Sequence, residues 1–301
     1  MSRIKIGRTS IVILLVGLMY VVLLVHNLDE SERRSLHLHA EARAVDSVLV
    51  PMRILSADLN NGEVRVVMGF QLRGNIAIDA ATPAVDLRLL LNSSRGPQQV
   101  DFPKGRRLNP VEAVFIMDGN ANRYPFDKHR GSLSFLIVTP RRPDTGGSSA
   151  FGQNTSVPVA VDLSASVPGV KFEERSEEGT SEIGFLGDLA VITLYMRRAQ
   201  NVIATSITVT VMMLGLGISV LAMVMQATVK GREAALLPLS LSVSLIFGLP
   251  ALRNLQPNVP PLGVLGDYVG YVWAELIVAA SSIVVVWAWV VRSRADRKSV
   301  V

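Results

Sequence analysis

The feature that most constrains this chain is the long apolar stretch of residues 202–291, which carries few charged side chains. A second apolar run, residues 9–27, follows three basic residues near the first methionine. Bilayer-spanning helices need about 20 apolar residues. The sequence therefore predicts one N-terminal transmembrane helix, 9–27, and three C-terminal ones: 200–229, 234–252 and 268–291.

Basic residues favour one orientation of these helices. The turn 230–233 contains Lys230 and Arg232, and more bases follow in the tail 292–301. The positive-inside rule predicts that residues 1–8, this turn and the tail are cytoplasmic, so that the protein spans the plasma membrane several times. The stalk 28–45, the domain 46–199 and the loop 253–267 would then be outside. A cleaved signal peptide is the alternative for 9–27, but no suitable cleavage site follows closely.

Composition separates an aqueous part from the apolar part. The charged fraction is 18%, below the roughly 25% of soluble domains, yet residues 29–199 resemble an ordinary globular domain. The absence of cysteine excludes disulfides, thiolate metal sites and a cysteine nucleophile. The net charge is +5, but the bases gather beside apolar segments, which favours a lipid bilayer and no nucleic acid as partner.

The aqueous domain shows an alternation of period two, which is typical of half-buried strands. Turn signals rich in glycine, asparagine and aspartate separate the runs. The runs are 63–74, 84–92, 112–117, 132–138, 157–165 and 190–198. We therefore predict an α+β membrane protein, with an extracytoplasmic antiparallel β-sandwich, immunoglobulin-like, between one N-terminal and three C-terminal transmembrane helices. Residues 28–45 are predicted to form a short amphipathic stalk.

Motifs for catalysis are absent from the sequence, which has no P-loop, no H-E-x-x-H and no G-x-S-x-G. His37 and His39 provide two metal ligands, which is an incomplete site. Glu173, Glu174 and the glutamates at 177 and 178 lack the alternating oxygen ligands of a calcium loop. We expect a protein that is not an enzyme and that has no metal or cofactor.

Two polar features lie inside the apolar stretch. Glu275 either faces a partner, a cavity or water inside the membrane, or lies near the outer interface, where water reaches it or it pairs with Arg253. The helix 234–252 carries a stripe that lines a pore in an oligomer or packs in a small bundle. With Glu233 at its cytoplasmic mouth, this stripe contains Leu236, Ser240, Val243 and Phe247.

The segment "YPFD", Tyr124 to Asp127, lies between two predicted strands. Pro125 favours an extended Tyr124. Phe126 is predicted to insert near residues 257–262, and Asp127 to pair with Arg198 or Arg197. A solvated surface loop is the alternative. The segment is thus predicted to be a mechanical joint between domain and membrane.

The basic anchor, the β domain, "YPFD" and the distinctive block 248–278 resemble an actinobacterial membrane-protein family known as domain of unknown function 4436. The resemblance covers most of the chain. It implies no activity, because the family is uncharacterised.

The order of several features is more distantly similar to that of pentameric ligand-gated ion channels. These features are the β-sandwich, the aromatic-Pro-Phe-Asp loop, Arg197 with Arg198, and the short turn before helix 234–252. The chain departs from that pattern in lacking the cysteine pair around the loop and a fourth C-terminal helix. Pro238 inside the presumed pore helix is a further departure.

These observations predict a non-enzymatic protein of the cell envelope whose outer sandwich binds a ligand or partner and is coupled to a helix bundle. One alternative is a channel-like homo-oligomer with helix 234–252 lining the pore. Another is an accessory subunit of an envelope transport complex, with Glu275 as a buried contact.

Overall fold

A computed structural model describes residues 35–42, 44–93, 96–140, 155–176, 179–229 and 236–299. Its contacts divide the chain into two compact units. Among the described residues, the β unit contains those up to Asn120 together with those of Asp127–Ala199. The helical unit contains Ala121–Phe126 and the chain from Gln200 onward. The predicted anchor 9–27 and the turn 230–233 lie outside the described residues.

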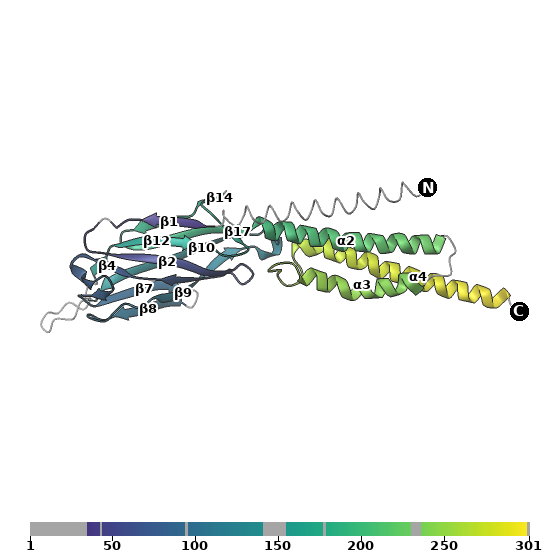
Figure 1. Ribbon diagram of the computed structural model, residues 1–301, viewed down its shortest axis with the longest axis horizontal. Coiled ribbons are helices and arrows are strands. Elements are labelled where there is room, and N and C mark those ends of the chain that lie inside the picture. Colours follow the sequence, from purple (N-terminus) through teal and green to yellow (C-terminus); the bar gives the residue numbers. More distant parts are fainter. Residues whose placement is uncertain are drawn as a thin grey trace, which may run out of the picture. The chain divides into compact units, whose positions relative to one another are not determined.

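A 13-stranded sheet forms the β unit, with β1, β12, β2, β3 and β9 as neighbours in one half. Most of its strands are labelled in Figure 1. The strands of this half are β1 (Leu36–Ala40), β2 (Ser47–Asp58), β3 (Glu63–Met68), β4 (Gln71–Arg73), β9 (Val111–Gly119) and β12 (Val159–Ala165). β4 extends the half by pairing with β2.

The other half of the sheet is built around β10, which pairs with β9, β17, β7 and β11. Its strands are β7 (Leu87–Ser93), β8 (Gly96–Phe102), β10 (Lys128–Thr139), β11 (Thr155–Val157), β13 (Val170–Glu173), β16 (Glu182–Leu186) and β17 (Leu189–Arg198). Two small hairpins complete the unit: β5 (Ala77–Asp79) with β6 (Thr82–Pro83), and β14 (Arg175–Ser176) with β15 (Gly179–Thr180).

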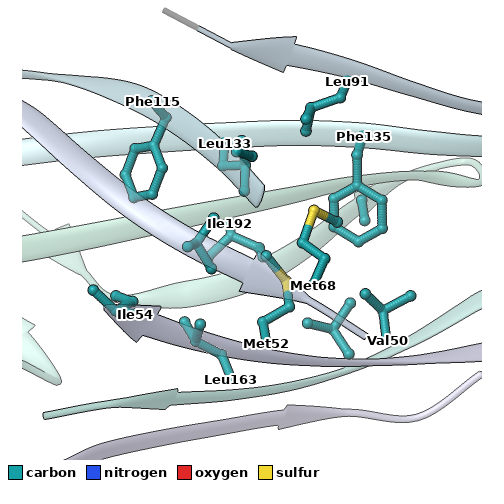
Figure 2. Packing of buried hydrophobic residues seen from close by; sticks show 14 of the residues in the cluster. Val50, Met52, Ile54, Met68, Leu91, Phe115, Leu133, Phe135, Leu163 and Ile192 are labelled. Atoms are coloured by element: carbon teal, nitrogen blue, oxygen red, sulfur yellow. The ribbon is translucent and has the colours of Figure 1, made fainter. Parts of the chain in front are cut away.

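One hydrophobic core holds the two halves together, and the longer strands point alternate side chains into it. Figure 2 shows Val50, Met52 and Met68 from one half near Leu133 and Phe135 from the other. All of these side chains are at most 2% exposed. Burying each contributes about 1.5–3 kcal/mol, so the core provides the main stabilisation of a unit that has no disulfide.

The structure corrects the predicted sandwich in three places. β12 pairs with β2 in parallel, so the sheet is not wholly antiparallel. β1 lies within the predicted stalk 28–45, where its five residues pair with β12 and Leu36 is buried in the core. β2 was not predicted, because Pro51 interrupts its pattern; the Pro51 carbonyl nevertheless accepts a bond from Gly69 N at 2.8 Å.

In its described residues, the helical unit has three helices that contact one another: α2 (Gln200–Val229), α3 (Leu236–Asn254) and α4 (Val272–Ser299). Two short helical turns, η2 (Ala121–Arg123) and η3 (Asp267–Tyr271), belong to the same unit. Small residues allow close packing, since Gly217 on α2 lies against the backbone of Ala274 on α4. α4 extends to Ser299, into the region that was predicted to be a tail.

Two helices among the described residues are long and apolar enough to cross a membrane, judged by length and composition alone. They are Gln200–Thr228, with a mean hydropathy of 2.3, and Asp267–Val291, with 2.1. α3, the third predicted C-terminal span, is not among them. The structure therefore supports two candidate spans at this end of the chain.

Candidate functional site

A buried ion pair closes one end of the β unit. Arg198 Nε donates to both carboxylate oxygens of Asp127, at 3.1 and 3.0 Å, and the two side chains are 2% and 0% exposed. Arg198 is the last residue of β17 and continues the buried alternation of Leu194 and Met196, and Asp127 directly precedes β10. A charge at such a position is costly unless it is paired, and here the structure contains one of the two predicted pairings.

Two further side chains complete this buried site. His129 Nε2 lies 2.8 Å from Asp127 Oδ2, and Arg198 Nη2 donates to Asn60 Oδ1 at 2.7 Å. Asn60 is positioned by a turn in which the Asp58 carboxylate accepts its backbone N–H at 3.0 Å. Gly119 leaves room for the imidazole, since a β-carbon there would lie 2.0 Å from His129 Nδ1. We call Asp127, Arg198, His129 and Asn60 the buried polar cluster.

The Asp127 carboxyl makes the cluster sensitive to acid. Burial alone raises its pKa, but the His129 hydrogen bond and the Arg198 charge outweigh burial, so the net pKa is below its usual value. A lowered folded-state pKa stabilises the protein above the unfolded pKa of about 3.9. This stabilisation is lost as the pH falls through the lower folded-state pKa.

We therefore expect the melting temperature of the wild type to exceed that of Asp127→Asn at pH 7, and this difference to shrink below about pH 4. Thermal unfolding of both proteins across this pH range in detergent measures the difference. A difference that stayed constant down to about pH 2 would contradict the assignment.

Arg197, the other predicted partner, pairs elsewhere. Its Nε lies 2.5 Å from Glu173 Oε1, an ion pair without the angle of a hydrogen bond. Arg197 and Glu173 lie on the outward face of the sheet and are partly exposed. The two neighbouring arginines thus have different roles, one buried and one near the surface.

Tyr124 anchors the segment Ala121–Phe126 inside the helical unit. It is 0% exposed, and its hydroxyl lies 2.6 Å from Ser206 Oγ on α2 and donates to Pro257 O at 2.9 Å. Its carbonyl accepts a bond from Gly266 N at 3.2 Å. Pro125, which follows through a cis peptide bond, is also buried. Phe126 is 55% exposed, so the prediction that it inserts near residues 257–262 is wrong. Tyr124 is the residue buried there.

The loop that holds Tyr124 is itself organised by a second buried ion pair. Arg253 donates to both oxygens of Asp267, at 2.9 and 3.0 Å, and both side chains are about nine-tenths buried or more. Asp267 also accepts Gly263 N at 2.9 Å, and Arg253 donates to Pro260 O at 2.7 Å. The loop 255–266 is thereby closed. Arg253 pairs with Asp267, so the alternative in which Arg253 pairs with Glu275 does not hold.

The remaining predicted positions lie on α3 and α4. Ser240, Val243 and Phe247 are exposed on α3, whereas Ser242 and Leu249 are buried against the other helices. The stripe is therefore not the packing face within this unit. Leu236 begins α3, and Glu233 lies outside the described residues. Glu275 has one buried oxygen, Oε2, without a hydrogen bond in the described part of the chain.

Candidate metal ligands do not gather in the described ranges, where no group of three or more histidine or acidic side chains is arranged to hold an ion. His37 and His39 are exposed on β1, opposite Ser164 and Asp162. Glu173 pairs with Arg197, and positions 177 and 178 lie outside the description.

Sequence reasoning missed four residues of these sites: Asn60, His129, Ser206 and Asp267. The sequence could have indicated His129, because residues two apart in an extended chain lie on the same face and His129 follows Asp127 by two. Asp267 also had one, because a lone acid beside an apolar run needs a partner. Asn60 and Ser206 had none, since their contacts depend on segments distant in the chain.

The fold and the site define a class of α+β proteins in which a β-sheet unit is followed by apolar helices. Residues 38–194 match the family described as a domain of unknown function, DUF4436, and residues 198–292 match a second, DUF8686. Since the first match covers more than half of the chain, this chain belongs to the DUF4436 family. The block 248–278 lies within the second match and not the first. No curated protein matches the chain.

Proposed function

We propose that this chain is a non-enzymatic membrane protein of the cell envelope. Its β unit lies outside the plasma membrane and binds a ligand or partner, and its helical unit lies in the bilayer. The two apolar helices and the basic residues that follow them in sequence support this placement. The segment Ala121–Phe126 transmits the bound state of the β unit to the helices.

One observation carries this proposal. Tyr124 is buried among residues of the helical unit, whereas Asp127, three residues later, is buried in the ion pair of the β unit. Each anchor is held by several hydrogen bonds, and only Pro125 and Phe126 lie between them in the chain. A change in strand β10, which begins at Lys128, is therefore passed along the chain to Tyr124.

The placement is tested by labelling introduced cysteines, since the chain has none of its own. We expect Arg106→Cys, at an exposed position of the β unit, to react with an impermeant maleimide in intact cells. Ser299→Cys should react only after permeabilisation. The reverse pattern would contradict the orientation.

The proposed role of the segment Ala121–Phe126 as the link between the units is tested by Tyr124→Phe. This change leaves the Pro257 carbonyl and the Ser206 hydroxyl without this partner and is expected to lower the free energy of unfolding by about 1–3 kcal/mol. The three tryptophans, Trp273, Trp287 and Trp289, all lie on α4, so their fluorescence reports the helical unit. The β-sheet amide I infrared band reports the β unit. We expect Tyr124→Phe to lower the melting temperatures seen by both probes.

Thr210→Val is the matched control, because it removes a hydroxyl from the same unit without touching residues 121–126. It is expected to move the fluorescence transition alone. If Tyr124→Phe also moved the fluorescence transition alone, the segment would not be the link.

A channel is the second candidate, favoured by the exposure of Ser240, Val243 and Phe247 on one face of α3. In a ring of copies this face would line the axis. Single-particle imaging of the detergent-purified protein tests this, together with conductance in planar bilayers, where Val243→Ser is expected to increase leak. A monomer would exclude this candidate.

A further inference from the structure

The loop 255–266, which follows α3, exposes three leucines. Leu255 and Leu262 are 72% and 68% exposed, and Leu265 is exposed as well. No charged residue lies between Arg253 and Asp267 in the sequence, and these two side chains are buried and paired with each other. Single exposed apolar side chains are common, but several in one uncharged segment indicate a surface that contacts a partner or a membrane. We call Leu255, Leu262 and Leu265 the loop leucines.

The backbone of this loop is held by polar groups of the helical unit. The N–H groups of Gly263 and Val264 both donate to Asp267, at 2.9 and 3.3 Å. The carbonyl of Pro260 accepts from Arg253 at 2.7 Å. The loop also contains three prolines, which have no N–H group to satisfy: Pro257, Pro260 and Pro261. Because unsatisfied backbone groups are costly away from water, these contacts suit a loop in a poorly hydrated environment.

The loop directly precedes the second candidate membrane helix. That helix, Asp267–Val291, has 25 residues and extends about 38 Å. The hydrocarbon core of a bilayer is about 30 Å thick, so both ends of the helix reach the headgroup layers. Tyr268 and Trp273 are exposed near its start, and Trp287 and Trp289 are exposed near its end. Aromatic side chains in these places are typical of the two interfaces of a membrane, which assigns the start of the helix, next to the loop, to one interface.

We propose that the loop leucines insert into the outer leaflet at the depth of the headgroups. This inference rests on the membrane placement proposed above and adds a second membrane contact beside the spanning helices. Irregular backbone exposed to lipid is excluded from the hydrocarbon core, whereas the interfacial layer accepts apolar side chains from a segment that does not cross the membrane. The pairing of Arg253 with Asp267 keeps both charges away from the lipid.

Fluorescence quenching in vesicles tests this depth. The full chain with Leu262→Cys, which then has a single cysteine, carries a bimane label and is reconstituted in phosphatidylcholine. Spin-labelled lipids quench from the membrane, either near the headgroups or near the ends of the acyl chains, and iodide quenches from water. We expect the label at position 262 to be quenched more strongly by the shallow spin label than by the deep one, and only weakly by iodide.

Two positions serve as references. Leu186→Cys is the matched control, because Leu186 is an equally exposed leucine, at 73%, on β16 of the β unit. Its label is expected to be quenched by iodide and by neither lipid. Ile283→Cys, at an exposed position of α4, reports the span itself and should be quenched more strongly by the deep spin label.

A further variant tests whether the leucines hold the loop in the membrane. In the labelled Leu262→Cys protein, Leu255→Ser with Leu265→Ser is expected to raise iodide quenching toward the value of the control at position 186. Leu255→Met with Leu265→Met keeps the apolar surface and should leave quenching unchanged. Tryptophan fluorescence during thermal unfolding verifies that each variant is folded. Equal quenching in the serine and methionine variants would overturn the role of the leucines.

The outcomes separate the loop from the span. Iodide quenching alone at position 262, with lipid quenching at 283, would overturn this inference and leave the membrane placement intact. A label at 262 that neither lipid nor iodide reaches would mean that a protein surface covers the loop, which would also overturn the lipid assignment. Iodide quenching alone at 283 would overturn the placement and this inference together.

Discussion

Replacing Asp127 with alanine is expected to lower the free energy of unfolding by about 3–5 kcal/mol, because the Arg198 guanidinium would remain buried without its carboxylate. The cost includes the hydrogen bond of His129. The melting temperature of the full chain in detergent, followed by the β-sheet infrared band, measures this effect.

A double-mutant cycle isolates the pair itself. Asp127→Asn and Arg198→Gln are expected to be non-additive by about 0.5–3 kcal/mol, because the second change no longer breaks an intact pair. The exposed pair Arg88–Asp101, with side chains 30% and 59% exposed, is the control and should show little coupling. Additive effects at both pairs would mean that burial does not strengthen the Asp127 interaction.

Asp267→Ala is expected to have a comparable effect on the helical unit, about 3–5 kcal/mol, because it removes the carboxylate from buried Arg253. It also leaves the Gly263 backbone N–H without its acceptor and so opens the loop that holds Tyr124. Tryptophan fluorescence during thermal unfolding measures this loss.

Asn254→Ala is the control for Asp267→Ala, since the Asn254 side chain accepts only a longer bond of 3.4 Å from the same arginine. It should change the melting temperature little. Asp267→Ala should also be non-additive with Tyr124→Phe, because both act on the loop 255–266. Independent effects would show that the ion pair does not position the loop.

Much of the β unit was predictable because alternation of apolar side chains is a local signal. Each of the six predicted runs contains at least part of a strand of the sheet. The parallel pairing of β12 with β2 was not predictable in this way, since periodicity says nothing about which strands become neighbours. β2 was missed because Pro51 in its middle resembles a strand break.

The candidate site was predictable where a buried charge requires a partner of opposite charge. Arg198 at a core-facing strand end needs an acid, and the sequence offered Asp127. The sequence could not show which of Tyr124 and Phe126 is buried, because burial depends on hydrogen-bonding partners for the Tyr124 hydroxyl on α2 and in the loop after α3. Hydrophobicity alone favoured burial of Phe126. The buried ring is instead that of Tyr124, whose hydroxyl group forms hydrogen bonds.

The assignment of Ala121–Phe126 to the helical unit means that this unit is not contiguous along the chain. A fragment beginning at residue 198, where the second family match starts, would lack Tyr124. Its Ser206 hydroxyl, Pro257 carbonyl and Gly266 N–H would each lose a hydrogen-bonding partner. The boundary between the two families in sequence is therefore not a boundary between two independent folding units, and the C-terminal part completes its fold with six residues from between β9 and β10.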